Sequence, residues 1–137
     1  MKGLTIAIEA SGQPESVVVT ADNGRFRGEA QAYVDLDVPY EWSEAIGRGP
    51  GPGEEPCTVS LGNVDPAYPD GGCRLRIEAE GGQGHLVCTV TIKDSDDIVT
   101  LRFPSEPALL DEFVAGLRSF RGFHVSPGTS ATLRMTA

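Results

Sequence analysis

The side chains that could catalyse a reaction are few in this 137-residue chain, and they are widely spaced. There are two histidines: His85 begins an apolar strand pattern after a GGQG turn, and His124 follows the last helical pattern. A histidine acts as a general base only when a partner group lies within hydrogen-bond reach at one cleft. We therefore expect two ordinary histidines and no enzyme, and we keep an enzyme that pairs either histidine with a carboxylate as an alternative.

Three cysteines, Cys57, Cys73 and Cys88, could act as nucleophiles, metal ligands or disulfide partners. All three fall on the apolar phase of their strands, where thiols are buried and inert. Their odd number and wide spacing do not suit a disulfide framework, and no CxxC pair offers a zinc site. The DSDD run at 94–97 lacks the glycine and distal glutamate of a calcium loop. We expect no metal and no cofactor, and we expect the cytoplasm, because the N-terminal residues do not resemble a secretory signal.

Acidic side chains are the most informative group. The formal charge is −9, and residues 1–69 hold 11 acidic against 4 basic residues. Such a balance argues against nucleic acid and anionic membrane surfaces, which both require a basic face. Helical spacing places Asp37, Glu41 and Glu44 on one face, and a carboxylate cluster of this kind attracts cationic partners. The alternative is a solvated face that serves solubility alone. The expected partner-binding residues are Asp37, Tyr40, Glu41, Glu44, Glu54 and Glu55. Tyr40 would pack against the partner, and Glu54 and Glu55 would form a flexible acidic flap.

Period-two alternation of apolar and polar residues dominates the chain and predicts β-strands. It appears in eight segments, residues 4–8, 17–19, 26–34, 57–61, 73–79, 86–92, 99–103 and 131–135. Gly28, Ala30 and Ala32 occupy the dry side of the third segment, so we expect a bulky element, a helix, to lie close above them. Residues 94–97 predict a hairpin turn.

Two segments change to helical spacing. In the first, Asp37 is a suitable N-cap, Pro39 suits the first turn and Gly47 can end the helix. In the second, Ser105 is the expected cap and Gly122 the expected stop. Its apolar stripe consists of Leu109, Leu110, Phe113, Val114, Leu117 and Phe120. Between the helices, the GRGPGPGEEP run at 47–56 predicts a flexible loop.

Most connections between strands are too short for parallel crossovers. The sequence therefore predicts a single α+β domain over residues 1–137, with a mostly antiparallel sheet of about eight strands and both helices packed on one face. No apolar run is long enough to span a membrane.

Three segments, FRGEAQAYVD, GHLVCTVTI and LLDEFVAGLRSF, occur in the same order as in a group of small, largely uncharacterised bacterial proteins. The chain resembles that group over residues 25–133, and some of its members resemble immunity proteins of polymorphic toxin systems. The resemblance implies an α+β fold, no catalytic residue and toxin neutralisation. It transfers no functional residue.

We therefore expect a non-enzymatic cytoplasmic binding protein, of the immunity type, that contacts a basic protein such as a toxin domain. One alternative is a small-molecule binding module with a pocket between sheet and helices, lined by Trp42, Phe113 and Phe120. Another is a structural or assembly domain, such as a homodimer. The interface of such an assembly would include three apolar residues on strand faces that the alternation predicts to be exposed to solvent, Val18, Val87 and Ile98.

Overall fold

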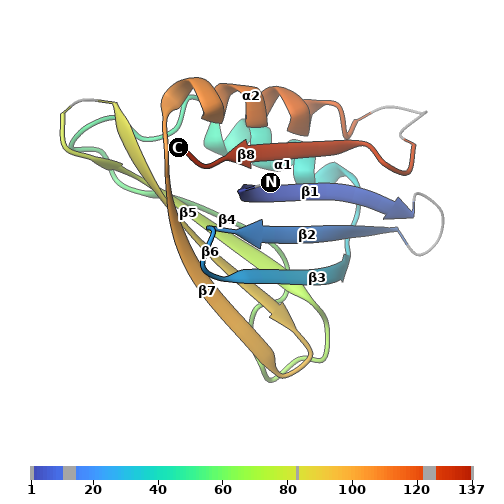
Figure 1. The fold of residues 1–137 in the computed structure, drawn as a ribbon. Coiled ribbons are helices and arrows are strands. Elements are labelled where there is room, and N and C mark those ends of the chain that lie inside the picture. The colour runs from blue at the N-terminus through green and yellow to red at the C-terminus, as the bar shows by residue number, and fades with distance from the viewer. Residues whose placement is uncertain (1, 11–14, 83, 122–125, 137) are drawn as a thin grey trace.

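The computed structural model describes residues 2–10, 15–82, 84–121 and 126–136. This part of the chain forms eight strands and two helices, which confirms the α+β class and the antiparallel sheet (Figure 1). In chain order the elements are β1 (Gly3–Ala10), β2 (Ser16–Asp22), β3 (Arg27–Tyr33), α1 (Asp37–Ile46), β4 (Cys57–Gly62), β5 (Gly72–Glu80), β6 (His85–Asp94), β7 (Asp97–Ser105), α2 (Pro107–Arg118) and β8 (Ser130–Arg134).

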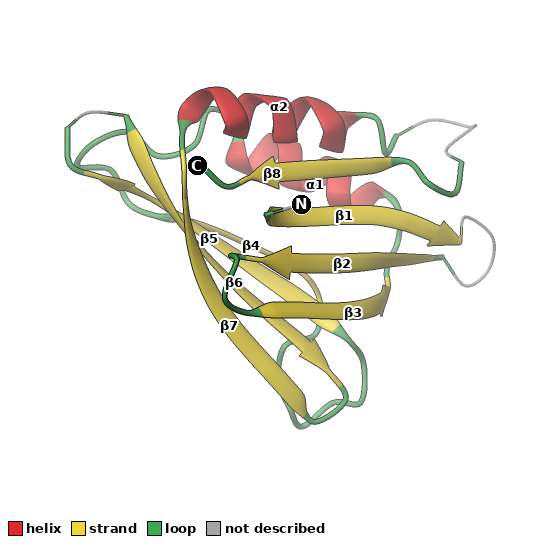
Figure 2. Ribbon diagram, viewed as in Figure 1, coloured by secondary structure: helices red, strands yellow, loops and turns green. Residues whose placement is uncertain are grey.

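The strands form two sheets, whereas the sequence predicted one. Sheet A has the order β3-β2-β1-β8, and sheet B has the order β4-β5-β6-β7 (Figure 2). The predicted hairpin at 94–97 joins β6 to β7, with Asp94 paired to Asp97 and Ser95 at a φ of 55°. Alternation shows which side of each strand is dry, but it does not show that the dry sides face each other in two layers.

Small side chains on β3 let sheet A approach sheet B closely. A Cβ atom on Gly28 would lie 2.4 Å from Cγ1 of Val99 on β7, and Ala30 and Ala32 beside it are buried. The bulky element that lies over this strand is therefore the second sheet, and the prediction of a helix there was wrong.

The two helices close the opposite side of the core. α2 contacts β8 at the edge of sheet A, α1 contacts β4 at the edge of sheet B, and the helices contact each other (Figure 1). Leu110, Phe113 and Leu117 of α2 and Trp42 of α1 point into the core, and the indole nitrogen of Trp42 donates to the Ser60 carbonyl at 3.0 Å. Each helix thus buries the apolar stripe that its spacing predicted.

The helix ends differ from the predicted caps. α1 begins at Asp37 and ends before Gly47, whose φ of 55° favours glycine, but Leu36 is the N-cap residue and no side chain caps the helix. The N-cap residue of α2 is Glu106, so the prediction of Ser105 was wrong. Ser105 is buried and donates its hydroxyl to the Arg134 carbonyl at 2.8 Å, which joins β7 to β8. The predicted stop at Gly122 lies outside the described residues.

The segment at 47–56 packs against α2 in its first half. Pro50 is buried, and a Cβ atom on Gly49 would lie 2.5 Å from Cδ2 of Leu110. Its second half, including Glu54 and Glu55, is exposed.

A fully buried lysine fixes the segment between β4 and β5. Lys93 lies near the end of β6 with 0% of its surface exposed, and its ammonium group donates to the carbonyl oxygens of Tyr68, at 2.6 Å, and Asp70. Lysine is almost never fully buried unless it is paired. Here two backbone carbonyls take the place of a carboxylate partner and tie residues 68–70 to the sheet.

We predict that Lys93→Met lowers the free energy of unfolding by about 1–3 kcal/mol, because it keeps the aliphatic stem and leaves two carbonyls without their donor. Urea unfolding should show a lower midpoint with an unchanged slope. The matched control is Lys2→Met, at an exposed lysine, which should leave the midpoint close to that of the wild type. Equal midpoints for the two variants would contradict the role assigned to Lys93.

Candidate functional site

The exposed face of α1 brings three of the predicted contact residues together. Asp37, Glu41 and Glu44 are all exposed, and their spacing of four and three residues places them along one face of the helix. The opposite face holds Trp42 and Ile46, which are buried in the core. Among the described residues, none of the three carboxylates lies within 4.0 Å of a basic nitrogen. We call Asp37, Glu41 and Glu44 the α1 acidic face.

Tyr40 lies beside this face and is covered by an arginine. The guanidinium of Arg121, which follows α2, lies 4.6 Å from the centroid of the Tyr40 ring. The pKa of Arg121 is raised, first by its interaction with Tyr40, and then by the charges of Asp37 and Glu44. This contact could not be predicted from the sequence, because it depends on how the two helices pack. Part of the Tyr40 ring surface that was expected to contact a partner is thus covered by Arg121. The positive charge of Arg121 also offsets part of the negative charge of the α1 acidic face.

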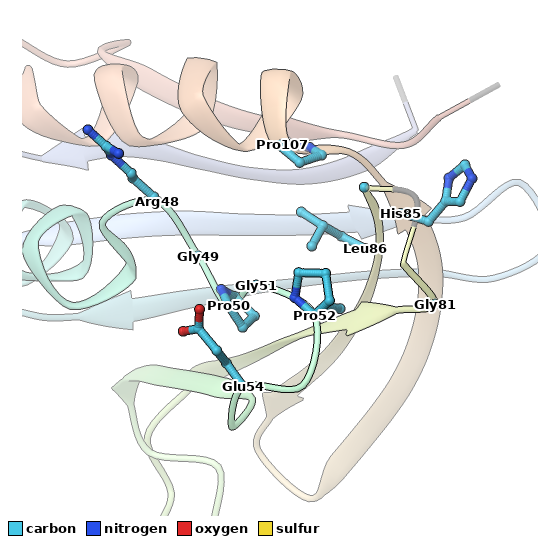
Figure 3. A pocket seen from close by; sticks show the side chains of 12 residues that line it. Arg48, Gly49, Pro50, Gly51, Pro52, Glu54, Gly81, His85, Leu86 and Pro107 are labelled. Carbon is cyan, nitrogen blue, oxygen red and sulfur yellow. The ribbon is translucent and has the colours of Figure 1, made fainter.

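Glu54 and Glu55 belong to a different part of the surface. Glu54 lines a cavity of about 260 Å³ between the 47–56 segment, the turn before β6 and the start of α2 (Figure 3). Pro52, Leu86 and Pro107 also line it. The six predicted contact residues therefore divide into two groups. Tyr40 and the α1 acidic face form one group, and Glu54 and Glu55 on the loop form the other.

The polar side chains of this cavity do not converge on a common point. Figure 3 shows Arg48 and His85 extending away from each other on opposite sides of the cavity. His85 is exposed, and His124, the other histidine of the enzyme alternative, lies outside the described residues. Among the described residues, no carboxylate oxygen lies within 4.0 Å of a nitrogen of His85, although Glu80 is its partner across β5 and β6. A general acid–base pair requires two groups within hydrogen-bond reach.

Trp42, Phe113 and Phe120, the expected lining of a small-molecule pocket, are core residues. Their exposed fractions are 3%, 0% and 1%, and they pack within the one apolar cluster formed between the sheets and helices. No cavity described above is lined by them.

The apolar residues considered for a dimer surface do not form one patch. Val18 lies on the outer side of sheet A and is half-buried, whereas Val87 and Ile98 lie on sheet B. Only Ile98 is clearly exposed, at 46%.

The three cysteines are free thiols, as their spacing predicted. Burial raises the pKa of Cys73 to about 12 and that of Cys88 to about 12. Cys57 is half-buried, burial also raises its pKa, and its thiol lies 3.7 Å from the Ala45 carbonyl. Thiolate is the reactive form, so each shift makes the thiol less reactive.

Within the described ranges, no group of three or more His, Cys, Asp or Glu side chains is arranged to hold a metal ion. Neither helix in the described part of the chain has the length and apolar composition needed to cross a membrane. Comparison with protein-family models, curated proteins and solved structures finds no match to this chain.

We predict that only Cys57 reacts with Ellman's reagent in the native protein at about pH 8, and that it reacts more slowly than a free thiol, because burial raises all three pKa values. Unfolding in urea should release the other two thiols. Cys57→Ser should abolish the native reaction and leave two thiols in urea. Fast native reaction of two or more thiols would contradict the burial of Cys73 and Cys88.

Proposed function

We propose that the chain is a non-enzymatic binding protein that contacts a basic protein through the α1 acidic face, in the manner of an immunity-type inhibitor. The observation that carries the proposal is that Asp37, Glu41 and Glu44 are exposed on one helix face and lack a close basic partner among the described residues. By contrast, Glu112 on α2 is bound by Arg134 at 2.6 Å. Carboxylates that are not already paired are available to a cationic partner.

Charge and rigidity both support this use of α1. The whole chain carries −9, so its long-range field attracts cations, and the exposed helix face concentrates that field at one place. α1 is held from below by the buried side chains of Pro39, Trp42 and Ile46. Its carboxylates are therefore presented on a fixed scaffold, which lowers the ordering cost of binding. Glu54 and Glu55 add two further exposed carboxylates on the loop that follows α1.

We predict that Glu41→Lys/Glu44→Lys slows association with a basic protein partner by roughly tenfold at low salt, because steering depends on the local charge of the docking face. A partner is first isolated on immobilised wild-type protein and purified. Its association rate is then measured by surface plasmon resonance at low and high salt. The difference between wild type and variant should shrink as salt rises.

The matched control is Asp96→Lys/Asp97→Lys, which makes the same change in net charge in the β6–β7 hairpin. It should retain most of the wild-type association rate. If both double variants slow association equally, net charge alone attracts the partner. If neither does, α1 is only a solvated face. Both results would reject the α1 acidic face as the contact surface.

Replacing Arg121 tests the same proposal in the opposite direction, because it should make association faster. Arg121→Gln removes the cation that covers Tyr40 and faces Asp37 and Glu44. We expect this variant to associate with the same partner roughly two- to threefold faster at low salt. Arg25→Gln, which makes the same charge change on the β2–β3 connection, should have a smaller effect. A slower rate for Arg121→Gln would mean that the partner contacts Arg121 itself.

A further inference from the structure

The outer face of sheet B carries a hollow with no acidic side chain in its lining. Alternation along the strands sends one set of residues into the core and the other set outward. The outward set lines a hollow of about 450 Å³, formed by Thr58, Arg74, Arg76, Thr89, Thr91 and Thr100. Two guanidinium groups and four hydroxyl groups thus share one surface, in a chain where acidic residues outnumber basic ones by 20 to 11.

The strand register explains how these residues meet. Arg74 on β5 is paired with Thr91 on β6, which is paired with Thr100 on β7. In the next row of the same face, Arg76 is paired with Thr89. The two arginines are therefore two residues apart on one strand, about 7 Å at the backbone, and threonines flank them on the neighbouring strand.

Two of the four hydroxyl groups are held in place by a hydrogen bond to each other. Thr91 is only 7% exposed, and its Oγ1 lies 3.1 Å from Oγ1 of Thr100 in a hydrogen bond. β-Branched side chains on a strand have restricted χ1 rotamers. Beyond Thr91 on the same face of β6 is Lys93, where the 68–70 segment is tied over the sheet. The hollow is thus built on a hydrogen-bonded strand ladder, and the next outward residue of β6 after Thr91 is fixed to the 68–70 segment.

The cationic charge of this face is largely uncompensated. Arg76 Nε lies 3.9 Å from Glu78 Oε1, a long contact between groups that are 52% and 38% exposed, and such pairs contribute little. Within the described ranges Arg74 has no carboxylate within 4.0 Å. Arg102 on β7 is paired with Thr89 in the row of Arg76, so a third arginine lies on the same face of the sheet.

We propose that this hollow binds a compact anion with two or more phosphate or sulfate groups. The planar fork of arginine donates two hydrogen bonds to one tetrahedral oxyanion, and threonine hydroxyls donate to its remaining oxygens. The volume is in the range of small-molecule sites. The net charge of −9 opposes a long polyanion, which would extend beyond the hollow over acidic surface.

The test is isothermal titration calorimetry at low salt with inorganic tripolyphosphate, and with sucrose octasulfate as the sulfated probe. We expect one site per chain. Arg74→Gln/Arg76→Gln should weaken binding at least tenfold, because it removes two charge-assisted donors. Thr89→Val should weaken it by a smaller factor. The probe that binds more tightly identifies phosphate or sulfate as the preferred group.

The matched control is Arg25→Gln/Arg118→Gln, which makes the same charge change at two exposed arginines outside the hollow and should stay within about twofold of wild type. In NMR spectra of the wild-type protein, addition of the probe should shift the amide resonances of β5, β6 and β7. Three outcomes would overturn the proposal. They are no binding of either probe at millimolar concentration, equal losses in the two arginine pairs, and tighter binding of a single-stranded oligonucleotide through the same arginines.

Discussion

The fold depends on the close approach of β3 to sheet B. Gly28 has no Cβ because Val99 occupies that space, and Ala30 and Ala32 continue the same narrow strip. Facing sheets normally lie about 10 Å apart, with side chains filling the space between them. Small residues at one edge bring the sheets together there, and a larger side chain at Gly28 would force them apart. The close edge is therefore what allows two four-stranded sheets to share one core.

The two helices cover the part of the core that the contact between β3 and sheet B does not close. β8 and β4 are edge strands of their sheets. α2 contacts β8, α1 contacts β4, and the two helices contact each other. Large side chains of the helices, such as Trp42 and Phe113, are buried in this part of the core. Since the helices bury one face each, their other faces must be polar. The acidic residues of α1 are exposed for this reason, whatever further use they have.

Local elements were predictable from the sequence, and their assembly was not. α1 occupies Asp37–Ile46, one residue longer at its start than predicted. The helix was predictable because its apolar spacing and Gly47 are local signals. The two-sheet division is a long-range property, since alternation does not say which dry faces meet. The same distinction between local and long-range relations applies to the predicted site residues. Helical spacing was enough to group Asp37 with Glu44, but the contact of Arg121 with Tyr40 depends on helix packing. Lys93 was unexpected because lysine is rarely buried.

The net charge of −9 hides two surfaces of opposite sign. Helical spacing gathers carboxylates on α1, whereas cross-strand register gathers Arg74 and Arg76 with threonines on the outer side of sheet B. Neither surface could lie in the core, because both are made of groups whose burial without partners is costly. The two surfaces lie on different elements, so each can be tested by substitution without altering the other. The net charge of the whole chain would predict only cationic partners. Because the register of sheet B gathers arginines at one place, an acidic protein can still have a local site for an anion.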